Sequence, residues 1–222
     1  MACGALLIAL FLSVAPTITT VSVTGARHVR IGQAIAQSGL LDAPAFLASA
    51  ASARAQLRAL PAVRDARVEI LLPQTASIVL VEREAAGRWI ASNGLEWFVD
   101  NEGVIFPSAD GNAAPQLRVT DERPPLQAGA RLDPALVQVA FRLAAIAPGE
   151  LRGDATAPRA VMTSGASGLV LRFGTGWEVR FGGPEAFDEK LAAAKRYLRD
   201  NPTRRLDYVD VRSADRIVVS PQ

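Results

Sequence analysis

The chain has 222 residues, half of them hydrophobic, which is enough for one large or two small folded domains. Its 24 lysines and arginines nearly balance its 22 aspartates and glutamates and are dispersed, which argues against nucleic-acid binding, because that function needs a clustered basic surface. One cysteine and one histidine exclude an internal disulfide and a histidine metal centre, so the sequence predicts no metal ion and no cofactor.

The first fifteen residues, MACGALLIALFLSVA, contain no charged residue and are followed by Pro16. A helix of this length is about 22 Å long, shorter than the roughly 30 Å hydrocarbon core of a bilayer. Three interpretations remain open: a transmembrane helix over residues 1–17 whose N-terminal part is missing, a signal-like segment without basic residues, or a buried helix. The first two place the rest of the chain outside the cytoplasm.

Residues 18–84 show the element order strand, helix, helix, strand, strand. The segment ITTVSVTG has the composition of a short strand, and a helix is expected over residues 31–38. A second helix is expected after Asp42 as its N-cap, because apolar residues recur there at helical spacing. This stripe consists of Phe46, Ala50, Ala53, Leu57 and Leu60. Two strands, VRDARVEILLP and ASIVLVERE, follow it.

Residues 85–222 are richer in short strands that are separated by turn residues. The first strands are RWIAS, LEWFV, VIF and PQLRV, with a hairpin turn in which Gly103 can adopt the positive φ that the turn needs. A helix is expected from Asp133, a good N-cap, and another from near Pro184. Between the two helices lie the strands RAVMT, GLVLRF and WEVRF, and a last hairpin, YVDVRSADRIVV, follows the second helix. The sequence therefore predicts an α+β chain with a membrane helix, a βααββ domain and a mixed β-domain with two helices.

Patterns that could carry catalysis are incomplete. SGASGLV has Leu169 where the nucleophile elbow needs its second glycine, and GTGWEV has Val179 where a dinucleotide fingerprint needs its third. We interpret both segments as turns between strands. Asp100 and Glu102 lie in a hairpin turn and are expected to be solvated rather than an acid–base pair. His28 is expected at the surface, so the sequence predicts neither an enzyme nor a small-molecule substrate.

Several segments resemble, in order, the FtsQ/DivIB family of bacterial division proteins. They are VSVTGARHVR, LRALPAVRDARVEILLPQTASIVLVEREAAGRWI, FVDNEGVIF and YVDVRSADRIVV. The resemblance implies that residues 18–84 form a POTRA domain and residues 85–222 the β-domain of that family. It also implies a single-pass inner-membrane protein with a periplasmic body. Such a protein is a non-catalytic scaffold that recruits FtsB- and FtsL-like partners at the division septum.

The same resemblance places the contact with the FtsB-like partner on the last hairpin. The implied partner-binding residues are Asp210, Arg212, Ser213, Ala214, Asp215, Arg216, Ile217, Val218 and Val219. An apolar edge strand is normally protected by charge, proline or a cover, and a partner strand would satisfy its free backbone groups. The alternative is an ordinary edge strand that is shielded by the flanking charges.

Two alternatives come from other classes of protein. Outer-membrane assembly and secretion components also carry POTRA domains, but they need membrane-spanning strands flanked by aromatic residues, and this chain is only 6% aromatic. An extracytoplasmic hydrolase would need a nucleophile or a carboxylate pair in a pocket, and no motif in the sequence supplies one.

Overall fold

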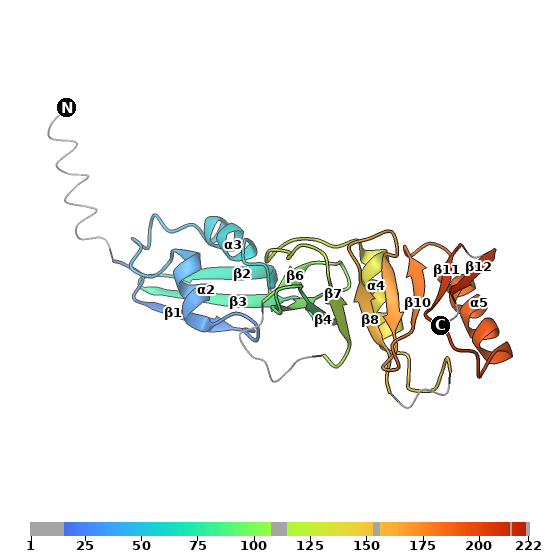
Figure 1. Cartoon of the computed structure of the whole chain (residues 1–222). Coiled ribbons are helices and arrows are strands. Elements are labelled where there is room, and N and C mark those ends of the chain that lie inside the picture. Colours follow the sequence, from blue (N-terminus) through green and yellow to red (C-terminus); the bar gives the residue numbers. More distant parts are fainter. Residues whose placement is uncertain (1–15, 108–114, 153–155, 214, 221–222) are drawn as a thin grey trace. The chain divides into compact units, whose positions relative to one another are not determined.

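A computed structural model of the chain describes residues 16–107, 115–152, 156–213 and 215–220. The chain divides into two compact units between Arg83 and Glu84 (Figure 1). The membrane helix expected at residues 1–17 falls almost entirely on residues 1–15, outside the described ranges. Thr17, which is described, forms a β-bridge with Pro44. Within the described ranges, no helix combines the length and the apolar character needed to cross a bilayer.

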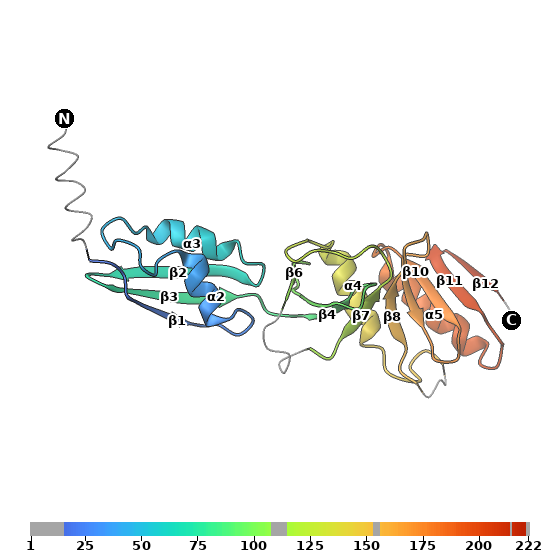
Figure 2. The same cartoon turned by 60° about the vertical axis from the view of Figure 1, so that its left-hand side comes forward.

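The first unit is a three-stranded sheet with two helices on one face (Figure 2). Its elements are β1 (Thr20–Thr24), α2 (Ile31–Ser38), α3 (Ala50–Arg58), β2 (Val63–Leu71) and β3 (Thr75–Glu82). The sheet order is β1-β3-β2, so β3 is central. Strand β1 runs parallel to β3, and β2 runs antiparallel to it. This is the βααββ order that the sequence predicts.

Alternation along β3 explains why the helices cover only one face of this sheet. Ala76, Ile78 and Leu80 are buried, whereas the residues between them are half-buried or exposed. Successive side chains of a strand point to opposite faces, so these three residues form the floor on which the helices pack. Helix α3 contributes Ala53 and Leu57, both buried, to the same core.

The second helix begins later than the sequence analysis predicts. Asp42 is not its N-cap: it has a φ of 63° and lies in a turn. The cap is Ser49, whose hydroxyl accepts a hydrogen bond of 3.2 Å from the amide of Ser52. Phe46, which was expected in the apolar stripe, lies before the helix and is 59% exposed. The stripe that packs on the sheet therefore begins within α3.

The second unit is built on a nine-stranded mixed sheet. Its strands are β4 (Gly87–Ile90), β5 (Glu96–Val99), β6 (Ile105–Phe106), β7 (Arg118–Asp121), β8 (Arg159–Met162), β9 (Leu169–Arg172), β10 (Glu178–Gly182), β11 (Tyr208–Ser213) and β12 (Arg216–Ser220). The sheet order is β12-β11-β10-β9-β8-β7-β4-β5-β6. The β5–β6 turn contains Gly103 with a φ of 79°, as predicted. Asp100 of this turn is buried rather than solvated as expected, because its carboxylate accepts hydrogen bonds from the amides of Glu102 and Val104, whereas Glu102 is exposed.

The two predicted helices of this unit each connect strands that pair in parallel. Helix α4 (Pro134–Ala144) leads from β7 to β8, and α5 (Phe187–Asp200) leads from β10 to β11. Asp133 caps α4 as expected, because its carboxylate accepts a 2.9 Å hydrogen bond from the amide of Ala135. Parallel neighbours need such crossover connections, since a tight turn joins only antiparallel strands.

One hydrophobic core lies between these helices and the sheet. Residues opposite one another on neighbouring strands, such as Leu171, Val179 and Val209, are fully buried in it. The residues that alternate with them, including Glu178 and Asp210, point to the other face of the sheet. The helix-free face of β9, β10 and β11 is therefore polar, and it leads directly to the last hairpin.

Candidate partner-binding hairpin

Strand β12 is at one end of the nine-stranded sheet. It pairs in antiparallel fashion with β11, and within the described residues no strand pairs with its other side. Ile217 and Val218 are 37% and 41% exposed, whereas Val219 is half-buried against the core. The hairpin thus presents an open edge with two exposed apolar side chains, as the sequence analysis anticipates.

Most of the predicted partner-binding residues come together on this hairpin, but they differ in exposure. Asp210 is buried, whereas Ser213, Asp215 and Arg216 are exposed. Ala214 lies outside the described residues. The register pairs Asp210 with Val218 and then shifts by one residue, so that Ser213 pairs with Arg216. This shift is a β-bulge, a feature that bends the edge of a sheet.

The direction of the backbone groups identifies which amides of β12 are free. The amide of Glu178 donates to the carbonyl of Asp207 across β10 and β11, at 3.1 Å. The carbonyls of successive strand residues point to opposite sides. The carbonyls of Tyr208 and Asp210 therefore point toward β12. The amide and carbonyl of Val218, the partner of Asp210, therefore point toward β11. The amides and carbonyls of Ile217 and Val219 point toward the open edge.

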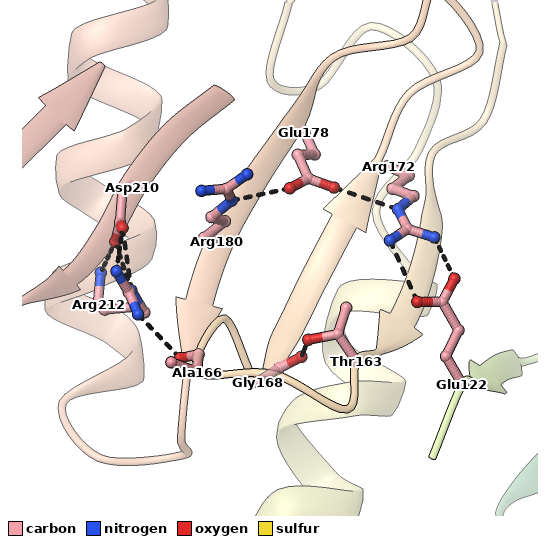
Figure 3. A network of polar contacts seen from close by, with 9 residues as sticks. All are labelled: Glu122, Thr163, Ala166, Gly168, Arg172, Glu178, Arg180, Asp210 and Arg212. Carbon is pink, nitrogen blue, oxygen red and sulfur yellow. Dashed lines mark hydrogen bonds and ion pairs between the residues drawn. The ribbon is translucent and has the colours of Figure 1, made fainter. Parts of the chain in front are cut away.

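Arg212 fixes the hairpin to its neighbours through two contacts (Figure 3). Its Nη2 donates to Asp210 Oδ2 at 2.7 Å, and its Nε lies 2.9 and 3.0 Å from the two carboxylate oxygens. Its Nη1 donates to the carbonyl of Ala166, in the turn between β8 and β9, at 2.9 Å. The same guanidinium therefore holds β11 and a turn that lies 46 residues away in the sequence.

Gly182, which has no side chain, leaves room for the side chain of Arg212. Gly182 has a φ of 74°, a conformation that L side chains rarely adopt, and it lies at a register shift of β10. A Cβ atom added there would lie 3.0 Å from the Cγ of Arg212. The aliphatic part of Arg212 therefore lies over the bare backbone of Gly182.

The Asp210 carboxyl is ionised more readily than an ordinary aspartate. Its burial alone would raise its pKa, but hydrogen bonds from the side chain and the amide of Arg212 outweigh that effect and lower the pKa. The nearby charge of Arg180 acts in the same direction. The Asp210 carboxylate and the Arg212 guanidinium are thus a charged pair within the hairpin, in which each group neutralises the other.

Further ion pairs continue across the helix-free face of the sheet (Figure 3). Arg172 on β9 binds Glu122 and also donates to Glu178 on β10 at 3.1 Å. Glu178 accepts a second hydrogen bond of 2.8 Å from Arg180, whose guanidinium carbon lies 3.8 Å from the ring centroid of Tyr208. Sequence analysis misses this row, because Glu122 and Arg172 are 50 residues apart in the chain.

A surface cavity of about 450 Å³ lies on the hairpin itself. Its lining residues are Asp210, Arg212, Ser213, Arg216 and Val218. All five belong to the predicted partner-binding set. The cavity combines one apolar side chain with two guanidinium groups and a carboxylate, so it suits a side chain of a protein partner better than an apolar small molecule.

The two segments that resemble catalytic motifs are turns, as predicted. In SGASGLV the amide of Gly168 donates to the carbonyl of Gly165, and the Thr163 hydroxyl donates to the carbonyl of Gly168 at 2.9 Å. In GTGWEV the amide of Gly176 donates to the carbonyl of Phe173, which closes the β9–β10 turn. Neither segment leads into a helix, as a dinucleotide-binding loop would.

Comparisons with known proteins agree with both units. Residues 17–83 match the family model described as "POTRA domain, FtsQ-type", and residues 87–212 match "Cell division protein FtsQ/DivIB, C-terminal". A cell division protein FtsQ of Chloroflexus aurantiacus is 30% identical over 197 residues, which cover 88% of this chain and 70% of that protein. The FtsQ of Chloroflexus aggregans has the same identity and coverage.

The FtsQ of Caulobacter vibrioides matches over a shorter stretch: it is 32% identical over 108 residues, covering 48% of this chain and 35% of that protein. A POTRA domain alone would also suit a component of outer-membrane assembly or secretion, but the model matched by residues 87–212 is specific to division proteins. With one matched model in each unit and relatives that span most of the sequence, the chain belongs to the FtsQ/DivIB family of cell division proteins.

Proposed function

We propose that the chain is a non-catalytic scaffold that recruits FtsB- and FtsL-like proteins to the division septum. Membership of the FtsQ/DivIB family supports a role in cell division. In this proposal the N-terminal segment anchors the chain in the inner membrane, and both units lie in the periplasm. The observation that carries the recruiting role is the open edge of β12, with its exposed Ile217 and Val218.

The proposed contact is the addition of one partner strand to β12. An extended segment of the FtsB-like partner would pair with the outward-facing amides of Ile217 and Val219, and so satisfy backbone groups that the sheet leaves unpaired. The cavity beside Val218 would then receive one side chain of the partner. Arg216, which lines this cavity beside the Asp210–Arg212 pair, favours an acidic side chain there.

Proline at position 217 tests this contact directly. Because the amide of Ile217 faces the open edge, Ile217→Pro removes a donor to the partner without removing a hydrogen bond within the sheet. Ile217→Ala is the matched control, since it also shortens the exposed side chain but keeps the amide. We expect the proline variant to lose capture of the periplasmic segment of an FtsB-like protein and the alanine variant to retain most of it.

Circular dichroism of both variants checks that they remain folded. A chain that lacks residues 216–222 serves as a second test, because it removes the whole strand. Wild-type affinity in both the folded proline variant and the truncated chain would rule out strand addition at β12. Equal losses in the proline and alanine variants would instead assign the contact to the side chain of Ile217.

We also propose residues 18–84 and 85–222 as separately folding domains. Limited proteolysis should then cut first between Glu84 and Arg88, close to the division between the two units. A first stable cut within residues 63–81, which hold β2 and most of β3, would contradict this boundary.

A further inference from the structure

Exposed apolar side chains gather at one end of the first unit. They lie in the segment before α3 and at the turn between β2 and β3. The five residues are Leu41, Phe46, Leu47, Leu71 and Leu72, and we call them the apolar tip. Leu47, the most exposed of them, has 66% of its surface accessible to water. Single exposed leucines are common on soluble proteins, but a group of this kind marks an interaction surface.

Backbone hydrogen bonds tie both parts of the apolar tip to residues 16–20. The carbonyl of Pro16 accepts a 2.8 Å hydrogen bond from Ala45, and the amide of Ile18 donates to Ala43 at 2.9 Å. On the other side, the amide of Thr19 donates to the carbonyl of Gln74, in the β2–β3 turn, at 2.9 Å. The tip therefore surrounds the point at which the chain enters the first unit (Figure 2).

The chemistry of this end of the unit is apolar rather than ionic. Residues 16–20, 40–48 and 71–75 contain a single charged residue, Asp42, and no lysine or arginine. In the sequence, residues 16–20 follow directly on residues 1–15, which carry no charge. An acidic partner or an anionic headgroup would need basic side chains here, so neither is the occupant that this surface fits.

We propose that the apolar tip inserts into the interfacial layer of the lipid bilayer. The inference rests on the proposed membrane anchor, since residues 1–15 adjoin Pro16 with no spacer between them and would hold the tip at the bilayer surface. Apolar side chains of this kind bury about 5–10 Å into the boundary between headgroups and acyl chains. The tip gives the first unit a second attachment to the membrane, beside the anchor itself.

The test uses the full chain in vesicles of zwitterionic phosphatidylcholine. In a Cys3→Ser background, Gln74→Cys places a single thiol in the exposed β2–β3 turn, next to the tip, for an environment-sensitive nitrobenzoxadiazole label. Lipids with a spin label near the top of the acyl chain quench the label if the turn reaches that depth. We expect a blue-shifted emission and strong quenching, both unchanged by added salt, because the tip carries no basic residue.

Two double variants of the labelled chain separate the tip from the anchor. Phe46→Ser with Leu47→Ser removes the two most exposed apolar side chains of the tip. The emission of the label should then return to its wavelength in water, and most of the quenching should be lost. Val79→Ser with Val81→Ser is the matched control, because these valines are also exposed on the first unit but lie outside the tip. The control variant should be quenched like the unaltered chain.

Each contrary outcome has a distinct meaning. A labelled chain that fails to float with vesicles removes the proposed anchor, and this inference with it. If the chain floats but the label is not quenched, the anchor stands and the inference is wrong. A blue-shifted label without quenching would mean that protein covers the tip, either residues 1–15 or a second copy. Quenching that persists in the Phe46 and Leu47 variant would also overturn the proposal.

Discussion

Replacement of Arg212 by alanine is expected to destabilise the second unit by about 1.5–3 kcal/mol, which is the usual cost of losing hydrogen bonds to a charged group. The Asp210 side chain is only 11% exposed, so water replaces little of what its carboxylate loses. Removal of one partner from a fully buried pair costs about 3–5 kcal/mol. Because the Arg212 side chain is 40% exposed, the expected loss lies below that range.

Urea unfolding followed by tryptophan fluorescence measures this loss in the second unit alone, because Trp89, Trp97 and Trp177 all belong to it. Arg196→Ala is the matched control: Arg196 lies 4.0 Å from Asp200 in a solvent-exposed pair, which is worth about 0–1 kcal/mol. Equal free energies of unfolding for the Arg212 variant and the unaltered chain would refute the role of Arg212 in holding the hairpin. A loss no larger than that of the Arg196 control would do the same.

Three other perturbations have defined outcomes. Leu57→Ala should cost about 2–5 kcal/mol by circular dichroism in urea, because the side chain is fully buried, whereas Arg58→Ala on the exposed side should cost little. Val218→Pro should destabilise the second unit more than Ile217→Pro, because only the Val218 amide faces β11; equal losses would contradict the assigned backbone directions. The lowered pKa of Asp210 stabilises the fold above the ordinary carboxyl pKa of about 4, and this contribution should fade as the pH falls through the lowered value. Carboxyl NMR titration would show an unshifted pKa if the pairing were absent.

Local signals predict those parts of the fold that depend on local chemistry. Asp133 precedes a proline and an apolar helical pattern, and it caps α4 as expected. The same logic fails at Asp42, two residues before Pro44, because aspartate is also a common turn residue, and here it adopts a positive φ. Phe46 falls on the helical spacing of the following residues, but the spacing does not show where the helix begins. Ser49 sets that point by capping α3.

The position of the candidate site follows from the sequence, but its internal contacts do not. A last apolar strand with Ile217 and Val218 is visible as a pattern, and so is its place at the end of the predicted elements. The link between Arg212 and the carbonyl of Ala166 depends on the order of strands in the sheet, which no local pattern records. Lys190 shows the same limit: it is buried, and it donates to the carbonyls of Phe181 and Gly183 at 3.0 and 3.1 Å.

The parallel pairing of β1 with β3 has a mechanical consequence for a cell division protein. The chain enters the first unit at the start of β1 and leaves it at the end of β3, and the two strands are paired from Thr20 opposite Thr75 to Thr24 opposite Val79. Tension between these two points pulls the strands along their length in opposite directions. All hydrogen bonds of the ladder then carry the load together, in shear. Tension on Ser220 would instead peel β12 from β11 one bond at a time, so the pairing of β1 with β3 resists tension along the chain better than the pairing of β12 with β11 does.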